Sequence, residues 1–97
     1  MKVIWSFVAA GNIVEQNQYI AKDDPEAARA VIKDIFNAGD CLKEFPEKGR
    51  VVPEFGNKNI KEIICRSYRI IYKIEPKRIT ILTVRHMREQ LKQEDVK

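Results

Sequence analysis

Apolar positions in the first half of the chain recur at helical spacing, most clearly over residues 25–42. Asp24 is a favourable N-cap and Pro25 suits the first helical position, so the helix is expected to begin there. Phe45 precedes Pro46, and a residue before proline disfavours helical backbone, so the helix should end by this point. One face of this helix is predicted to lie in the core.

A second, weaker helix is expected from about residue 7 to 21, after Ser6 as N-cap. Gly11 and Asn12 interrupt its apolar stripe, which makes it a poorer helix than residues 25–42. Residues 1–5 are apolar and β-branched enough to form a short strand before it. The first half therefore predicts a strand followed by a helical hairpin.

After Gly49 the pattern changes to short apolar runs with strand character. Residues 50–55 give a short strand limited by a proline, and residues 59–66 give a second. Residues 68–75 and 78–86 form a hairpin around a Pro-Lys turn. The order of one strand, two helices and three or four strands predicts a single α+β domain over residues 1–97, with the helical hairpin laid across an antiparallel sheet and a polar tail from about residue 90.

A symmetric turn at Pro76 and Lys77 would set the register of the last two strands, because residue 75 would then pair with residue 78. In that register Arg69 faces Val84, and His86 is its diagonal neighbour on the same face of the sheet. The opposite, mostly apolar face would carry Tyr68, Ile70, Tyr72 and Ile74 beside Ile79, Ile81, Thr83 and Arg85. The register thus predicts that the side chains of Arg69 and His86 converge.

Composition supports a folded domain, with 44% hydrophobic and 33% charged residues. The formal net charge of +4 is unevenly distributed. Residues 1–48 carry 6 Lys and Arg against 8 Asp and Glu, whereas residues 49–97 carry 12 against 6. The second half could therefore bind a polyanion or an acidic protein, or it could simply present a solvated basic face.

Several classes of protein do not fit the sequence. No apolar run approaches the roughly 20 residues that cross a bilayer, and the first residues do not form a secretory signal, so we expect a cytoplasmic protein without membrane association. Cys41 and Cys65 lack metal-binding spacing and the single histidine is distant in sequence, so no metal or cofactor is expected. Two free thiols in a reducing compartment are the simplest interpretation.

Motifs along nearly the whole chain, residues 2 to 89, resemble the RelE/ParE superfamily of toxins from type II toxin–antitoxin systems. They are WS near the start, DDPEAA, FPEKGRVVPEF, SYRIIYKIE and ITILTVRH. The resemblance implies a βααβββ fold, growth arrest and a cognate antitoxin that neutralises the toxin. It also implies one of two targets, DNA gyrase for the ParE branch or mRNA on the ribosome for the endonucleases. Members are often described as plasmid stabilisation proteins.

The resemblance also implies candidate site residues. In YoeB-like endonucleases a Glu after proline, an Arg in the hairpin and a His at the end of the last strand form the site, and Glu54, Arg69 and His86 match them. Such a nuclease needs a base for the ribose 2′-hydroxyl, a phosphate clamp and an acid, which these three could supply. Met87 stands where those relatives have tyrosine, and a thioether cannot replace a phenol.

Basic residues outside that set are candidates for target binding. Lys61 is the one possible match to the lysine-rich sites of RelE-like toxins, and Arg85 and Arg88 would bind a target in a ParE-like toxin.

Each candidate has a purely structural alternative. Glu54 could be a solvated loop charge, Arg69 could pair with Glu62 or Glu75, and His86 could cap a strand end. Arg85 and Arg88 could be ordinary surface residues. Trp5, Tyr68 and Tyr72 alternate with aliphatic residues and are expected in the core rather than in a base-stacking surface.

Three hypotheses for the function follow. The first is a ParE-like toxin that binds its target without cleaving it. The second is a ribosome-dependent mRNA endonuclease of the RelE/YoeB kind, and the third is a non-toxic RNA-binding module. The motif pattern as a whole favours the first, whereas Glu54, Arg69 and His86 keep the second open.

Overall fold

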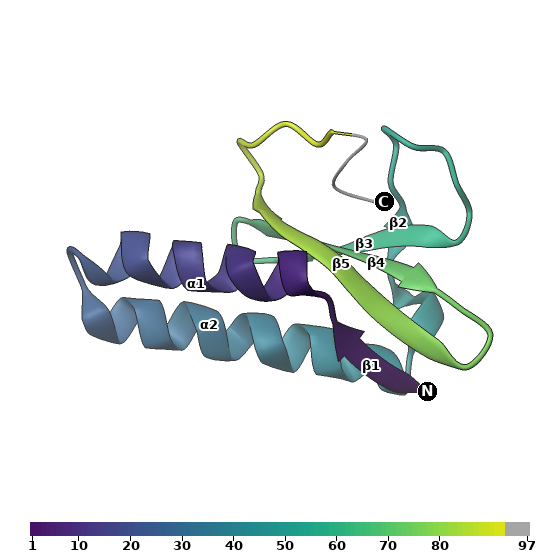
Figure 1. Ribbon diagram of the computed structural model, residues 1–97, viewed down its shortest axis with the longest axis horizontal. Coiled ribbons are helices and arrows are strands. Elements are labelled where there is room, and N and C mark those ends of the chain that lie inside the picture. The colour runs from purple at the N-terminus through teal and green to yellow at the C-terminus, as the bar shows by residue number, and fades with distance from the viewer. Residues whose placement is uncertain (93–97) are drawn as a thin grey trace.

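The computed structural model describes residues 1–92 and consists of two layers, a helical hairpin and a five-stranded sheet (Figure 1). Two short 3-10 helices, η1 (Cys41–Lys43) and η2 (Pro46–Lys48), follow the second long helix. The other elements are β1 (Lys2–Trp5), α1 (Phe7–Ala21), α2 (Pro25–Asp40), β2 (Arg50–Val51), β3 (Ile60–Cys65), β4 (Tyr68–Ile74) and β5 (Arg78–His86). The predicted α+β architecture is confirmed.

The sheet has the strand order β1-β5-β4-β3-β2. Neighbours from β2 to β5 are antiparallel, as expected for strands joined by short turns, but β1 runs parallel to β5. The sheet is therefore mixed rather than purely antiparallel. No local turn links β1 to its neighbour, because the helical hairpin and the other strands separate them in sequence, so its direction could not be inferred from turn geometry.

The two helices begin at the predicted caps. The Ser6 hydroxyl accepts a hydrogen bond of 3.0 Å from the Ala9 N–H, and an Asp24 carboxylate oxygen accepts one of 3.1 Å from the Ala27 N–H. Each side chain satisfies a backbone donor that has no partner inside the helix. The helices then cover one face of the sheet (Figure 1).

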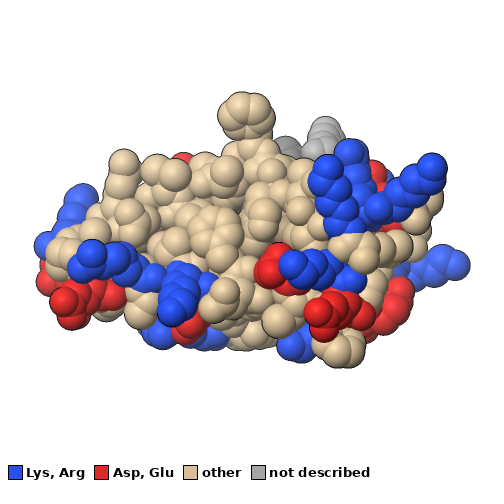
Figure 2. Space-filling view, turned by 90° about the horizontal axis from the view of Figure 1, so that it is seen from below, with Lys and Arg blue, Asp and Glu red and all other residues tan. Residues whose placement is uncertain are grey.

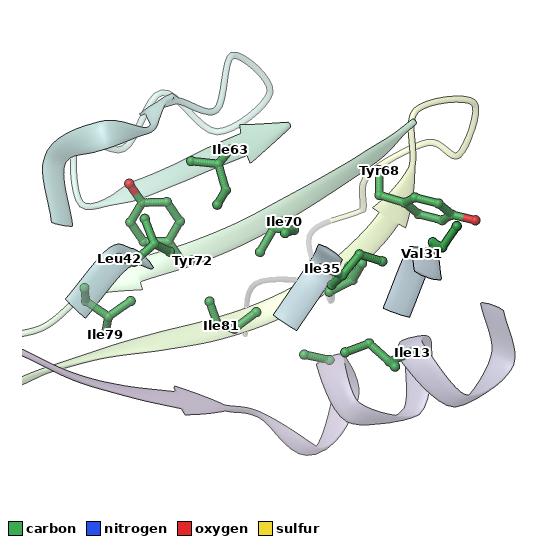
Figure 3. Close-up of a cluster of buried hydrophobic side chains, with 12 residues drawn as sticks. Ile13, Val31, Ile35, Leu42, Ile63, Tyr68, Ile70, Tyr72, Ile79 and Ile81 are labelled. Carbon is green, nitrogen blue, oxygen red and sulfur yellow. The ribbon is translucent and has the colours of Figure 1, made fainter. Parts of the chain in front are cut away.

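The main core lies between the helices and the sheet (Figure 3). Tyr68 and Tyr72 belong to this core and Trp5 packs against it, as predicted. Burial of each large side chain contributes about 1.5–3 kcal/mol to folding. The largest fully buried aliphatic residues of this core are Ile35, Leu42, Ile70, Ile79 and Ile81.

A smaller apolar cluster covers the opposite face of the sheet. Its buried members are Val52, Ile60, Ile71 and Leu91. Leu91 is 8% exposed and so the beginning of the predicted polar tail is anchored to the sheet, although Gln90 is exposed. The rest of that tail, residues 93–97, lies outside the described residues.

A β-bulge at Leu82 changes the register of the β4–β5 hairpin. The pairs from Ile74–Ile79 to Tyr72–Ile81 follow the predicted register, but Ile71 then pairs with Thr83, one residue further along. The extra residue coincides with a contact from α1. The Oδ1 atom of Asn12 accepts hydrogen bonds from the Thr83 hydroxyl (2.8 Å) and the Val84 N–H (3.0 Å). Buried Asn12, which weakened the helix prediction, therefore fixes α1 onto the bulge.

The predicted pairing beyond the bulge is wrong as a result. Arg69 lies opposite Arg85 instead of Val84, and His86 lies opposite Tyr68. A bulge moves every following side chain of one strand to the other face relative to its partner strand. Arg85 thus shares a face with Arg69, whereas His86 is on the helix-covered face with Tyr68.

Candidate functional site

Arg69 is at the centre of an ion-pair network on the sheet face that points away from the helices. Its Nε donates to Oε1 of Glu62, and its two terminal nitrogens donate to both carboxylate oxygens of Glu54 at 2.7 and 3.0 Å. The side chain of Arg69 is only 11% exposed. The alternative that Arg69 pairs with Glu62 is confirmed, and Glu54 is a second partner.

Glu62 joins this network to a second arginine. Its side chain is completely buried, and its Oε2 accepts a hydrogen bond of 2.7 Å from Nε of Arg50. The four side chains form an alternating row of Arg50, Glu62, Arg69 and Glu54 with no net charge. Such a row stabilises each charge through its neighbours and leaves little potential to attract a phosphate.

The electrostatics of the row argue against proton transfer by its members. The hydrogen bonds from Arg69 lower the pKa of Glu54 to about 2, so this carboxylate is a poor base at neutral pH. Hydrogen bonding to Glu54, followed by that to Glu62, raises the pKa of Arg69 above its ordinary value. Both groups stay charged and bonded to each other.

His86 lies on the other side of the sheet, at the end of β5. Its ring packs edge-on against Tyr68 with 5.3 Å between ring centroids. Nδ1 accepts a hydrogen bond of 3.1 Å from the Arg88 N–H, and the backbone N–H of His86 donates to Glu89 at 3.0 Å. The neutral imidazole therefore carries its proton on Nε2. Burial raises the pKa of the Tyr68 phenol, so Tyr68 stays protonated.

An open cleft of about 540 Å³ lies beside His86, between α1 and the end of β5. Gln16 crosses its floor, where it accepts a hydrogen bond from the Tyr68 hydroxyl and donates one to Glu89, both at 3.3 Å. The remaining lining residues are Glu15, Tyr19, Ile20 and Arg88. Both acidic and basic side chains line this cleft, so it lacks the uniform positive charge of a phosphate site.

The structure separates the three candidate nuclease residues. Glu54 and Arg69 are in direct contact, but His86 is on the opposite face of the sheet, and its predicted convergence with Arg69 is wrong. An in-line cleavage needs the base, the phosphate clamp and the acid around a single phosphodiester. The described residues do not form that arrangement.

The three basic candidates also fail to form one surface. Lys61 pairs across the strands with Tyr72, on the helix side, and lies 3.5 Å from the Glu47 carboxylate. Arg85 lies on the Arg69 face and donates to Glu89 at 3.1 Å. Arg88 is exposed in the turn after β5, beside the cleft. Lys61 therefore lies apart from the two arginines at the end of β5.

Sequence reasoning missed three members of these arrangements. Arg50 and Gln16 were not candidates because they lie 12 and 52 positions from Glu62 and Tyr68, the residues they contact. Glu89 was not a candidate because its contact with His86, three positions earlier, depends on the turn after β5. One signal was present, since Glu62 lies inside β3 between Ile60 and Ile64, the apolar residues on the same face of the strand. A carboxylate in that position is seldom buried without a cationic partner.

A metal site and a membrane-spanning helix would each require particular features in residues 1–92. This part of the chain contains no group of three or more His, Cys, Asp or Glu side chains placed to bind a metal ion. None of its helices combines the length and apolar character needed to span a bilayer.

Comparison with known proteins identifies the family. Residues 3–91 match the family model described as "ParE toxin of type II toxin-antitoxin system, parDE". The chain belongs to the ParE toxin family. The predictions of the RelE/ParE superfamily and of a ParE-like toxin are thereby confirmed.

Two relatives support the assignment of this ParE-family toxin. It is 36% identical to the protein Y4kP of Sinorhizobium fredii (strain NGR234) over 92 residues, covering 92% of this chain and 91% of the relative. It is 27% identical to Toxin RelE2 of Caulobacter vibrioides over 86 residues, covering 88% and 93%.

Solved structures of toxin–antitoxin systems share the fold. A chain of the chromosomal ParDE system from P. aeruginosa superposes with a TM-score of 0.74 at 19% identity, covering 89% of this toxin and 95% of that chain. A chain of the RelBE2 complex from Mycobacterium tuberculosis gives 0.56 at 22% identity, with 88% of each chain covered. At these identities the likeness concerns the fold.

Proposed function

We propose that this ParE-family toxin arrests growth by binding a macromolecular target without cleaving RNA, and that the target is DNA gyrase, as membership of the ParE branch implies. One observation carries the proposal. Arg69, the expected phosphate clamp, is bonded to Glu54 and Glu62, and His86 lies on the opposite face of the sheet. A reaction that needs these groups together has no site among them.

The proposed contact with the target is the exposed end of β5. Arg88 and Met87 are exposed there, and Arg88 lines the same cleft as His86. An exposed arginine beside an apolar side chain is a common combination in protein–protein contacts, where arginine contributes both charge and packing. Arg85 contributes less, because Glu89 already neutralises it.

A cognate antitoxin completes the proposal. We infer that the antitoxin neutralises the toxin in the cytoplasm by covering the end of β5 and the cleft next to it. The ParDE and RelBE2 structures with the same fold come from such two-component systems, which supports a protein partner. Co-expression and pull-down of this chain with the product of the adjoining reading frame would test the partnership.

The test of the target uses two assays on purified toxin. We expect inhibition of gyrase supercoiling and no cleavage of ribosome-bound mRNA. Arg88→Ala should weaken gyrase inhibition and reduce its salt dependence, because it removes a charge from the contact. Arg78→Ala is the matched control, since this arginine is also exposed but lies at the opposite end of β5.

Two results would overturn the proposal. The first is mRNA cleavage by the wild-type toxin that is lost in His86→Ala or Glu54→Ala, which would establish a nuclease whose site is assembled on the ribosome. Toxicity in cells with neither gyrase inhibition nor RNA cleavage would assign the toxin to a different target.

A further inference from the structure

The outer face of α1 is unusually apolar for a helix on the surface of a small protein. Nine of its fifteen residues are exposed, yet Glu15 is its only charged residue. Phe7 is 99% exposed, and Val14, two turns along the helix, is 55% exposed. Figure 2, which shows the molecule from below the view of Figure 1, has a broad uncharged area with charged groups to its left and right. Large exposed apolar side chains in a stripe mark an interaction site.

The stripe is symmetric in sequence. Phe7 and Val14 are its two large residues, and Ala10 and Gly11 lie midway between them. Ala10 follows Phe7 by three positions, and Val14 follows Gly11 by three positions. Read in either direction, the order is large, small, small, large. A helix with this order is complementary to an antiparallel copy of itself, because each large residue meets the large residue at the other end and the small ones meet at the centre.

Gly11 has no role inside the monomer that would explain it. A Cβ atom at this position would meet no other atom within 4 Å, and its backbone is helical. Glycine inside a helix costs roughly 0.5–1 kcal/mol relative to alanine. Glycine and alanine at adjacent positions do, however, let the backbone of a second helix approach closely.

A groove beside the stripe provides space for the exposed phenylalanine. This groove has a volume of about 330 Å³ and lies between α1 and α2, with its apolar walls formed by Ile13, Val14 and Ile32. In an antiparallel pair of α1 helices centred between Ala10 and Gly11, Phe7 of each copy reaches Val14 of the other. Val14 also lines the groove, so Phe7 of one copy would lie at the edge of the groove of the other.

We propose that this toxin forms a homodimer through α1, with the two helices antiparallel and crossing at Ala10 and Gly11, and with Phe7 of each copy in the groove of the other. The contact is isologous, so it closes at two copies. The stripe carries no charge, and pairing it with itself therefore brings no like charges together. The proposal is independent of the gyrase target and of the antitoxin.

The first test measures the mass of the full-length toxin by light scattering at micromolar concentrations. We expect twice the monomer mass. Phe7→Ala should raise the dimer Kd at least about a hundredfold, because each dimer loses two buried phenylalanines. Val8→Ala is the matched control, since Val8 is also exposed in the first turn but lies beside the stripe. Monomeric wild-type toxin, or equal effects of the two substitutions, would overturn the proposal.

A substitution at the crossing point separates association from folding. Gly11→Gln replaces glycine with a better helix former in open space, so the monomer should stay folded while the dimer is lost. A dimer that survives this change would contradict the close helix crossing.

Cross-linking tests the geometry directly. In a background of Cys41→Ala and Cys65→Ala, Ala10→Cys should form a disulfide between the two copies, because the crossing places the two positions close together. Gln18→Cys on the same stripe should not, since the two copies of that residue would be about 22 Å apart along the helix axes. Absence of a cross-link at residue 10 would refute the homodimer. Protection of the α1 backbone amides from hydrogen exchange only when the antitoxin is bound would also refute it, and would assign this face to the antitoxin.

Discussion

Removal of Arg69 should be among the most damaging single changes to this protein. Arg69→Ala leaves Glu62 with a single cationic partner, Arg50, whose side chain is 66% exposed, although the Glu62 side chain itself is completely buried. Loss of one partner from a buried ion pair costs about 3–5 kcal/mol. Small domains have a total stability of roughly 5–15 kcal/mol, so this variant should lose much of its free energy of unfolding.

Two matched variants show whether burial causes the effect. Glu54→Ala removes a carboxylate that is 41% exposed, so the loss should be on the order of 1 kcal/mol, although this residue makes two hydrogen bonds to Arg69. The double variant Glu62→Leu with Arg69→Met removes both buried charges and replaces them with apolar side chains of similar size. It should be more stable than Arg69→Ala alone.

Urea unfolding at one fixed protein concentration measures these differences. Trp5, the only tryptophan, packs against Phe36 at 4.9 Å between ring centroids and reports on the loss of tertiary structure. A loss for Arg69→Ala no larger than that for Glu54→Ala would refute the argument. So would a double variant that is less stable than Arg69→Ala.

Three further predictions concern other parts of the molecule. The pKa of Glu54 is about 2 in the folded chain against an ordinary 4.5, so its pairing stabilises the protein fully above pH 4.5 and is lost as the pH falls towards 2; urea unfolding across this range should show a smaller pH dependence for Glu54→Ala. Asn12→Leu leaves the buried Thr83 hydroxyl and one backbone N–H without their acceptor and should cost about 1–3 kcal/mol in thermal unfolding, whereas Asn17→Leu on the exposed side of α1 should cost little. Gly39→Ala would press a methyl group into the Trp5 ring, so it should destabilise the protein by about 1–3 kcal/mol and shift the fluorescence of that residue.

The secondary structure was predictable because its causes are local. Ser6 and Asp24 are N-cap residues that mark the starts of the two helices in the sequence. After Gly49 the spacing of apolar residues changes from the helical period to the alternation of a strand. The turn around Pro76 fixed the first three pairs of the hairpin correctly. Each of these features depends on residues within a few positions of one another.

The candidate site could not be predicted in the same way. The convergence of Arg69 with His86 depended on an uninterrupted register, and the bulge at Leu82 breaks it. That bulge is bonded to Asn12, more than 70 positions earlier, so nothing near the hairpin signals it. Glu62 was a candidate partner of Arg69 from the pattern of the strand, but the choice between partners needed the register of β3 against β4 as well.

The position of β5 in the sheet determines when the toxin can fold during its synthesis. This strand lies between β1 and β4, and among residues 1–92 it is the last strand to be synthesised. Before β5 has left the ribosome, β1 has no neighbouring strand in the sheet, and Asn12 of α1 has no bulge to bind. The core also lacks Ile79 and Ile81 at that stage. Contacts between distant parts of a chain form slowly and only when both parts are present. A nascent chain that lacks β5 therefore cannot complete the sheet or the core of this fold.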